Sequence, residues 1–593
     1  MAHLLGAEEI SLEFPTKTVF NQLTIGLNDG DRIGVVGRNG DGKSTLLKLL
    51  AKQLEPDSGR VTHRGGLRVG MLKQTDEFND TDSIGYAVVG HQPEHEWAGN
   101  PKIREVISGL LSDLDWEHAV GQLSGGQRRR VALAALLVQD WDVLMLDEPT
   151  NHLDVEGVAW LADHLNSRWN KNQAGLVVVT HDRWFLDAVC NYTWEVHDGI
   201  IEPFEGGYAA YILQRVERDR SAAATEARRQ NLLRKELAWL RRGAPARTSK
   251  PKFRLDAAAE LIDGEPEPRD RVGLSKLATA RLGKDVLDVE NIDYSIGELS
   301  LLKDVTFRLG PGDRVGLVGV NGAGKTTFLK LITGELQPTA GRIKRGKTVQ
   351  IATLSQEVRE LDEFAEQRIY ELIAREKTTM QVDGVEVSTT QLVEQLGFSK
   401  AQLQTPIGEL SGGQRRRLQF LRLLFGEPNV LILDEPTNDL DTDILAAIEN
   451  LLDSWPGTLI VVSHDRYLLE RVTDQQFALL GDGSVRHLTG GVEQYLKLRA
   501  ASLGGSSQTS PVVKQTEAGL SGAALREAEK NLSRIERALE KLAGDEAKLH
   551  AEMAEHDQSD FAGLTVLAGK QRELNEKREQ LEVEWLETSE SLV

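Results

Sequence analysis

Two glycine-rich runs carry residues suited to binding a nucleoside triphosphate. Gly37–Ser44 reads GRNGDGKS and Gly319–Thr326 reads GVNGAGKT, and both fit the pattern G-x-x-x-x-G-K-[ST]. Each follows a short apolar run that predicts a strand and opens a run that predicts a helix. Glycines let backbone N–H groups surround phosphates, and Lys43 or Lys325 would contact the β- and γ-phosphates. The predicted ATP-binding residues of the two loops are Gly37, Asn39, Gly40, Gly42, Lys43, Ser44, Thr45, Gly319, Asn321, Gly322, Gly324, Lys325, Thr326 and Thr327.

Two apolar runs, VLMLDE and VLILDE, predict buried strands that end in paired acids. Asp147 and Asp434 would support Mg²⁺ together with the hydroxyls of Ser44 and Thr326. The second acid of each pair, Glu148 or Glu435, would orient or polarise the attacking water. The sequence therefore predicts two sites of Mg²⁺-dependent nucleoside triphosphate hydrolysis.

The landmarks occur twice in the same order. The offsets between equivalent residues are 282 for the loop lysines, 287 for LSGGQRRR and LDEPTN, and 283 for the HDR runs. Such constant offsets predict a duplicated α/β domain of about 210 residues, which is too large for a solenoid repeat.

Both copies resemble ATP-binding-cassette ATPase domains, whose signature sequence is LSGGQ. The resemblance implies that the cassettes close head to tail, so that each phosphate loop shares its nucleotide with the opposite signature. It also implies catalytic roles for Gln74 and Gln356, which would sense the metal and water, and for His181 and His464, which would contact the γ-phosphate. Asp154 and Asp441 match the loop that crosses the cassette interface, and Phe14 and Tyr294 match the adenine-stacking aromatic, although an aromatic in an early strand is as often part of the core. The signature residues carried over are Ser124, Gly125, Gly126, Gln127, Ser411, Gly412, Gly413 and Gln414.

One loop residue distinguishes the two sites. Asp41 lies inside the first phosphate loop, where the second has Ala323. An acid beside a triphosphate is unfavourable unless it points outward. The nucleotide affinity of the first site is therefore harder to predict than that of the second site.

Composition limits the kinds of partner. The chain of 593 residues has a formal net charge of −21 and one cysteine, Cys190, which predicts no intramolecular disulfide. No apolar run is long enough for a membrane span, and the N-terminus lacks the pattern of a signal peptide. We expect a cytoplasmic protein, and a monomer whose two cassettes pair with each other.

Local charge points to nucleic acid at one place. Residues 215–254 contain 13 Lys and Arg against 4 Asp and Glu, a net charge of +9. A solvated helix face is the ordinary explanation of a charged run, but one-sided charge at a helix break favours RNA phosphates. The RNA-binding residues predicted at this tip are Arg241, Arg242, Arg247, Lys250, Lys252 and Arg254. The arginines after each signature, 128–130 and 415–417, are equivocal because polar helix faces commonly look alike.

The last segment predicts a coiled-coil hairpin. Apolar residues from Leu525 to Met553 follow 3,4 spacing, and Leu567, Leu574 and Leu581 continue at heptad spacing after a turn. Residues 523–593 carry 10 basic and 17 acidic residues, net −7, so duplex DNA binding by this segment is doubtful. A protein partner, or packing on the cassettes, is at least as plausible.

The whole arrangement resembles the ABC-F class, most closely its Uup branch. The predicted domains are a first cassette at 1–214, a basic helical linker at 215–284, a second cassette at 285–500, a tether at 501–522 and the coiled-coil hairpin at 523–593. The resemblance implies an ATP-gated clamp on the ribosome, with the linker contacting rRNA and tRNA. The alternatives are a Uup-like factor acting on branched or replicating DNA, and a nucleotide-binding subunit recruited to a transporter.

Overall fold

A computed structural model of the protein divides the chain into two compact units, Met1–Gly504 and Gly505–Val593. Nearly all the described residues belong to the first unit, and only Arg534 belongs to the second. The structure describes residues 2–15, 17–73, 78–170, 172–218, 283, 286–297, 299–355, 359–376, 379–382, 385–388, 393, 398, 402–437, 440–504 and 534.

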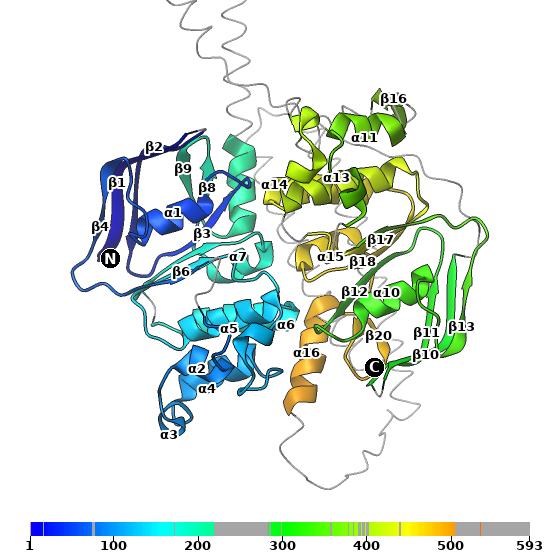
Figure 1. The fold of residues 1–593 in the computed structure, drawn as a ribbon, viewed down its shortest axis with the longest axis horizontal. Coiled ribbons are helices and arrows are strands. Elements are labelled where there is room, and N and C mark those ends of the chain that lie inside the picture. Colours follow the sequence, from blue (N-terminus) through cyan, green and yellow to red (C-terminus); the bar gives the residue numbers. More distant parts are fainter. Residues whose placement is uncertain are drawn as a thin grey trace, which may run out of the picture. The chain divides into compact units, whose positions relative to one another are not determined.

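The first cassette contains two sheets (Figure 1). The smaller is antiparallel, in the order β2-β1-β4, and the larger has six strands in the order β5-β6-β7-β3-β8-β9. Neighbours in the larger sheet are parallel except β8 and β9, which are antiparallel. The strands are β1 (His3–Phe14), β2 (Lys17–Asn28), β3 (Arg32–Gly37), β4 (Ser58–His63), β5 (Val69–Leu72), β6 (Val143–Asp147), β7 (Gly175–Val179), β8 (Tyr192–His197) and β9 (Ile200–Glu205).

The helices of this cassette connect the parallel strands. They are α1 (Lys43–Leu50), α2 (Ile84–Val89), α3 (Glu94–Trp97), α4 (Pro101–Leu110), the 3₁₀ turn η1 (Val120–Gln122), α5 (Gly125–Leu137), α6 (Val155–Ser167) and α7 (Arg183–Val189). A further helix, 208–218, runs through the predicted boundary at 214/215. Parallel strands need such crossovers, so the helices cover the sheet and its strands become buried.

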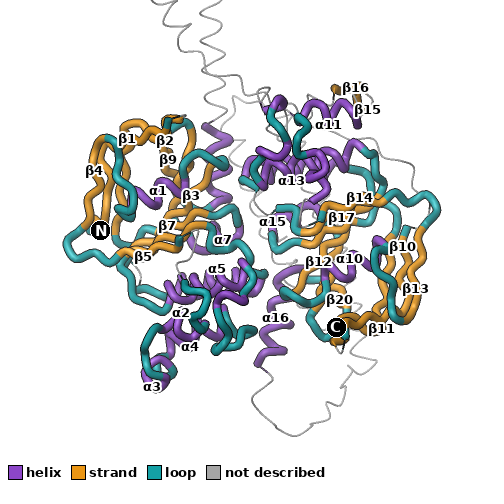
Figure 2. Tube along the Cα trace, in the orientation of Figure 1, coloured by secondary structure: helices purple, strands orange, loops and turns teal. Residues whose placement is uncertain are grey.

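The second cassette repeats this topology. Its small sheet has the order β11-β10-β13 and its large sheet the order β14-β17-β18-β12-β19-β20, with an additional β15-β16 hairpin. Figure 2 shows the small and large sheets of each cassette as separate groups of strands. The strands are β10 (Leu287–Ile296), β11 (Leu299–Leu309), β12 (Arg314–Gly319), β13 (Ala340–Arg345), β14 (Ile351–Leu354), β15 (Thr379–Val382), β16 (Val385–Ser388), β17 (Val430–Asp434), β18 (Thr458–Val462), β19 (Gln475–Leu479) and β20 (Val485–Leu488).

The helices of the second cassette follow the same order as those of the first. They are α10 (Lys325–Thr333), the 3₁₀ turns η2 (Arg359–Phe364), η3 (Gln402–Gln404) and η4 (Ile407–Glu409), α11 (Ile369–Glu376), α13 (Gly412–Phe425), α14 (Thr442–Ser454), α15 (Arg466–Val472) and α16 (Gly491–Gly504). The prediction of two α/β cassettes is confirmed.

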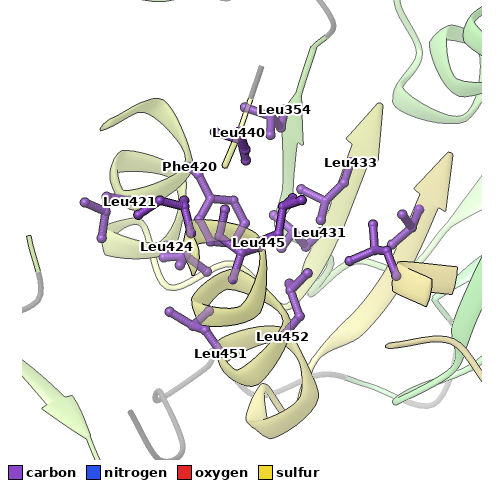
Figure 3. Packing of buried hydrophobic residues seen from close by; sticks show 14 of the residues in the cluster. Leu354, Phe420, Leu421, Leu424, Leu431, Leu433, Leu440, Leu445, Leu451 and Leu452 are labelled. Atoms are coloured by element: carbon purple, nitrogen blue, oxygen red, sulfur yellow. The ribbon is translucent and has the colours of Figure 1, made fainter. Parts of the chain in front are cut away.

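Apolar burial explains why the central strands occupy the middle of each cassette. Every residue of β6, β7, β17 and β18 is buried. Leucines of α13 and α14 pack against Leu431 and Leu433 of β17 (Figure 3). Burial of each such side chain contributes roughly 1.5–3 kcal/mol. The rigid sheet therefore fixes its carboxyl ends, where the catalytic loops begin.

Two predicted segments fall outside the described part of the chain. These are the basic tip of the linker and the coiled-coil hairpin, which stay predictions, as do the domain boundaries. Within the described residues, no helix is long and apolar enough to cross a membrane. Cys190 is a free, buried cysteine.

Candidate active site

Each phosphate loop ends in a glycine that starts the following helix. Gly42 and Gly324 have φ angles of 97° and 94°, in the left-handed region that glycine adopts readily, and neither helix α1 nor α10 has a side-chain cap. By contrast, Ser124 and Ser411 cap α5 and α13 with their side chains. An α-helix does not use its first backbone N–H groups in its own hydrogen bonds, so those of α1 and α10 can bind an anion. The helix dipole also favours an anion at this end.

The loop lysines lie across their own loops. Lys43 Nζ donates to the carbonyls of Gly37 and Arg38 at 2.8 and 3.0 Å, and Lys325 Nζ donates to those of Gly319 and Val320 at 2.6 and 3.2 Å. Burial lowers the pKa of both lysines, although neighbouring carboxylates counteract it. Each amine is therefore held where it can meet the phosphates of a nucleotide bound in its loop.

The hydroxyl and carboxylate expected to bind magnesium lie together in the second cassette. Thr326 Oγ1 donates to Asp434 Oδ2 at 3.0 Å, and Asp434 is buried at the end of β17. Burial raises the pKa of Asp434 and of Asp147, although the nearby hydroxyls of Thr326 and Ser44 counteract it. Hard oxygen donors of this kind suit Mg²⁺, and the positive charge of an ion would favour the ionised carboxylates.

The two predicted catalytic glutamates share an unusual backbone conformation. Glu148 and Glu435 both have φ of 49°, which is strained for a residue with a β-carbon. Their N–H groups donate to Val179 and Val462 of the neighbouring strands at 2.8 Å. The sheet thus holds each glutamate in a conformation that the residue alone would not favour.

Each glutamate faces the histidine that is predicted to contact the γ-phosphate. His181 Nε2 lies 3.4 Å from Glu148 Oε1, and His464 Nε2 lies 3.4 Å from Glu435 Oε1. Burial, with the charge of Lys43, lowers the pKa of His181 to about 3, and burial with Lys325 lowers that of His464 well below its usual value. Burial raises the pKa of Glu435 to about 7. The histidines are therefore neutral at neutral pH, and a neutral imidazole can either donate or accept a hydrogen bond.

The two signature sequences form matching helix starts. Ser124 and Gln127 form a reciprocal capping box at α5, and Ser411 and Gln414 form one at α13. A β-carbon on Gly125 would meet no atom within 4 Å. Internal packing therefore does not require glycine at this position, whereas close approach of a phosphate would. The packed structure thus leaves room at Gly125 for the predicted nucleotide contact.

The arginines after each signature make contacts within their own cassettes. Arg128, Arg130 and Arg415 form ion pairs with Asp80, Asp113 and Asp362. The middle arginine of each triplet binds main chain near the catalytic acids. Arg129 donates to the carbonyls of Lys73 and Asp147, and Arg416 donates to those of Asp434 and Glu435. Sequence reasoning missed this role, because a triplet of arginines gives no sign that the middle one binds main chain beside the catalytic acids.

Aspartates at the start of α6 and α14 contact the phosphate loop of the other cassette. Asp441 Oδ2 accepts from Asn39 N at 3.4 Å, and Asp154 Oδ2 accepts from Asn321 N at 3.5 Å. These are the crossing residues that the cassette resemblance implied. The structure thus joins each phosphate loop to the opposite cassette, while nucleotide sharing between a loop and the opposite signature stays a prediction.

The hairpin tip of β1 and β2 lies beside the first phosphate loop. Lys17 Nζ donates to Gly40 O at 3.1 Å and lies 3.5 Å from Asp41 Oδ1. Asp41 Oδ2 also accepts a hydrogen bond from Arg38 N at 3.2 Å. The carboxylate of Asp41 is therefore bound by neighbouring groups of its own cassette. Phe14, which pairs with Lys17, is 44% exposed, and adenine stacking on it stays a prediction. Tyr294 is partly buried against the core of its cassette.

Some of the predicted site residues lie outside the described residues. These are the two glutamines, Gln74 and Gln356, and the six basic residues of the linker tip.

Comparison with known proteins agrees with the two-cassette fold. The family model described as ABC transporter matches residues 20–151 and 302–438, one match in each cassette. The chain is 36% identical over 534 residues to "Uncharacterized ABC transporter ATP-binding protein YfmR" of Bacillus subtilis, covering 83% of this chain and 84% of that protein. It is 33% identical over 530 residues to "Energy-dependent translational throttle protein EttA" of Escherichia coli, covering 83% and 94%. A solved structure of RNase-L Inhibitor shares the fold, with a TM-score of 0.59 and 21% identity over 83% of this chain and 93% of that one.

Fold and site together define a tandem-cassette ATPase. The relatives cover both cassettes and most of the chain. The chain belongs to the ABC-F family, and its activity is the hydrolysis of ATP. Its assignment to the Uup branch stays a prediction.

Proposed function

We propose that this ATPase is a cytoplasmic translation factor that acts on the ribosome as an ATP-gated clamp. The observation that carries the proposal is the match to EttA, a protein named as a translational throttle, over 94% of its length. The net charge of +9 at residues 215–254, in a chain of net charge −21, supports contact with rRNA or tRNA.

In this proposal ATP closes the two cassettes on each other. The loops Gly37–Ser44 and Gly319–Thr326 bind the phosphates, and each meets an aspartate of the other cassette. Mg²⁺, held by the Ser44–Asp147 and Thr326–Asp434 pairs with Gln74 and Gln356, would neutralise phosphate charge. Glu148 and Glu435 orient the attacking water, and the neutral histidines hydrogen-bond the γ-phosphate. Hydrolysis then removes the group that joins the cassettes, and the clamp opens.

Ribosome co-sedimentation tests the proposal. The variant Glu148→Gln, Glu435→Gln should pellet with ribosomes in ATP and stay in the supernatant in ADP. In the same background, changing Arg241, Arg242, Arg247, Lys250 and Lys252 to Gln should weaken pelleting and reduce its dependence on salt concentration. Absence of ATP-dependent pelleting in the parent variant would overturn the ribosome assignment.

A matched control separates local from overall charge. Five exposed basic residues of the small sheets and β20 can be changed to Gln, which gives the same loss of positive charge away from the linker. They are Arg60, Arg308, Arg342, Lys344 and Arg486. This control should pellet like its parent. Equal weakening by both sets would contradict a linker-specific contact. Salt-sensitive binding to branched DNA that is lost on deleting 521–593, or recovery with membranes, would instead support the two alternative functions.

A further inference from the structure

One carboxylate of the second cassette contacts two different parts of the first. Asp443 lies in the first turn of α14, two residues after Asp441. Arg215 of helix 208–218 binds it through both nitrogens of its fork, with Nη1 2.7 Å from Oδ1 and Nη2 3.2 Å from Oδ2. Arg38 of the phosphate loop lies 3.6 Å from Oδ2 through Nε. Asp443 therefore joins the first phosphate loop to helix 208–218.

The geometry makes this contact directional. A bidentate arginine–carboxylate pair fixes the orientation of both groups as well as their distance. Burial would raise the pKa of Asp443, but the hydrogen bonds and charge of Arg215, with Arg38, hold it below its usual value. The carboxylate is thus ionised at neutral pH and bound from two sides.

Arg215 is also fixed within its own cassette. Its Nη1 donates to the hydroxyl of Tyr211 at 2.9 Å, and that hydroxyl donates to Glu195 Oε1 at 2.9 Å. Arg215 Nε lies 3.3 Å from the same oxygen. Because Tyr211 and Arg215 stand one turn apart on helix 208–218, the contact with Asp443 fixes the helix and not only one side chain. The predicted basic linker begins at 215, within this helix, and continues after it.

A related arrangement holds the last described helix of the second cassette against the first cassette. Tyr495 and Arg499 of α16 bind Glu156 of α6, with Tyr495 Oη and Arg499 Nε 2.6 and 2.8 Å from Oε1. Glu156 lies two residues after Asp154, the aspartate that contacts Asn321. The chain after α16 enters the predicted tether and tail. Each cassette thus uses the start of one helix to hold the last helix of the other.

The two arrangements differ in several contacts, because Tyr211 donates to Glu195 of its own cassette whereas Tyr495 donates to Glu156 of the other, and one difference lies in the phosphate loop. The position of Arg38 in the first phosphate loop is taken by Val320 in the second. The second loop therefore has no charged side chain there to contact Glu156. Among the described residues, only the first loop forms an ion pair with the carboxylate that binds the last helix of its cassette, whereas Lys325 of the second loop interacts with Glu156 through charge alone.

We propose that Asp443 is the positioning residue through which closure at the first ATP site sets the orientation of the linker, while Glu156 holds the helix that leads to the tail. This inference rests on the proposed ATP-gated closure. With ATP in the first loop, Arg38 and Asn39 are ordered against Asp443 and Asp441, and Arg215 docks on the same carboxylate. When the cassettes open, Asp443 leaves both arginines, and helix 208–218 loses its support on the second cassette.

Amide hydrogen exchange on the full chain tests this without ribosomes. In the Glu148→Gln, Glu435→Gln background, ATP with Mg²⁺ should slow exchange in both 208–218 and α16 relative to ADP. Adding Asp443→Ala should speed exchange of 208–218 in ATP by about tenfold or more, the factor expected for a lost charge-assisted pair, and leave α16 unchanged. Adding Glu156→Ala, the matched control, should speed exchange of α16 and leave 208–218 unchanged.

A second variant tests whether Asp443→Ala acts only by disturbing the local fold of α14. Arg215→Met changes the partner on the other cassette and also removes the contacts with Tyr211 and Glu195, so it should speed exchange of 208–218 at least as much as Asp443→Ala, and the two together should have no more effect than Arg215→Met alone. The proposal is overturned if ATP does not protect 208–218 in the parent, if Asp443→Ala affects both helices equally or neither, or if the double variant is additive. Failure of ribosome co-sedimentation with these exchange effects intact would refute the proposed function alone.

Discussion

At the scale of single residues, the catalytic glutamates combine chemistry with backbone strain. A carboxylate at Glu148 or Glu435 can orient water, and the sheet holds each residue at φ of 49°. A glutamine keeps the shape but cannot polarise water in the same way. We expect Glu148→Gln, Glu435→Gln to reduce ATP turnover by about 100-fold or more while ATP still binds. Measurement of phosphate release alongside retention of labelled ATP checks this, and normal turnover would contradict the assignment.

The backbone strain at Glu148 predicts a stability effect that is separate from catalysis. Alanine at φ of 49° keeps the β-carbon clash, whereas glycine does not. Glu148→Gly should therefore be more stable than Glu148→Ala by about 1 kcal/mol, measured as the apparent melting temperature. The order should reverse at Arg104, an exposed position within α4, where glycine costs about 1 kcal/mol relative to alanine. If alanine is more stable than glycine at both positions, the backbone at Glu148 is not strained.

At the scale of elements, the signature helix is tied to the catalytic strand of its own cassette. Arg416 of α13 is buried and bonds the carbonyls of Asp434 and Glu435 at the end of β17. Methionine at 416 would leave buried carbonyls unsatisfied, at a cost of about 1–3 kcal/mol. Arg416→Met should therefore lower the apparent melting temperature and reduce turnover more than ATP affinity.

Its neighbour supplies the control. Arg415 pairs with the more exposed Asp362, and such surface pairs contribute about 1 kcal/mol or less. Arg415→Gln should leave melting and turnover close to those of the parent. Comparable losses in the two variants would show that the inward position of Arg416 has no special part in the site.

Sequence patterns predicted the elements better than the contacts between them. The apolar runs before GRNGDGKS and before each Asp-Glu pair predicted buried strands, and β3, β6, β12 and β17 are such strands. Those patterns are local, because one loop and the helix after it contain the whole phosphate cradle. Arg215 and Asp443 are 228 residues apart, and neither has a local pattern that names its partner. Likewise, positive φ at Glu148 depends on the neighbouring strand and has no sign in the residue type.

At the scale of the whole molecule, the duplication is not symmetric where the cassettes meet. Arg183 is buried and bonds Glu449 and Asp465 of the second cassette. Its equivalent, Arg466, lies with its guanidinium 3.6 Å from the ring centre of Trp184 and forms no ion pair within the described residues. The equivalent of Glu449 in the first cassette is Ala162, so Arg466 lacks one of the two acids, while Asp182, the equivalent of Asp465, acts on Arg466 through its charge. Arg183 also lies over the ring of Tyr467, so among the described residues one side of the interface has buried ion pairs beside an aromatic contact and the other has the aromatic contact without an ion pair.

This asymmetry predicts unequal effects of equivalent substitutions. Arg183→Met would leave Glu449, which is 1% exposed, with Arg471 as its remaining cationic partner, and breaking a buried pair costs about 3 kcal/mol. Arg466→Met replaces a stacked cation by an apolar side chain and should cost about 1 kcal/mol. In the Glu148→Gln, Glu435→Gln background, Arg183→Met should lower the melting temperature further and reduce ATP-dependent compaction measured by small-angle scattering. Equal effects of the two substitutions would show that the ionic side does not dominate cassette pairing, since the aromatic contact would then contribute as much as the buried pair.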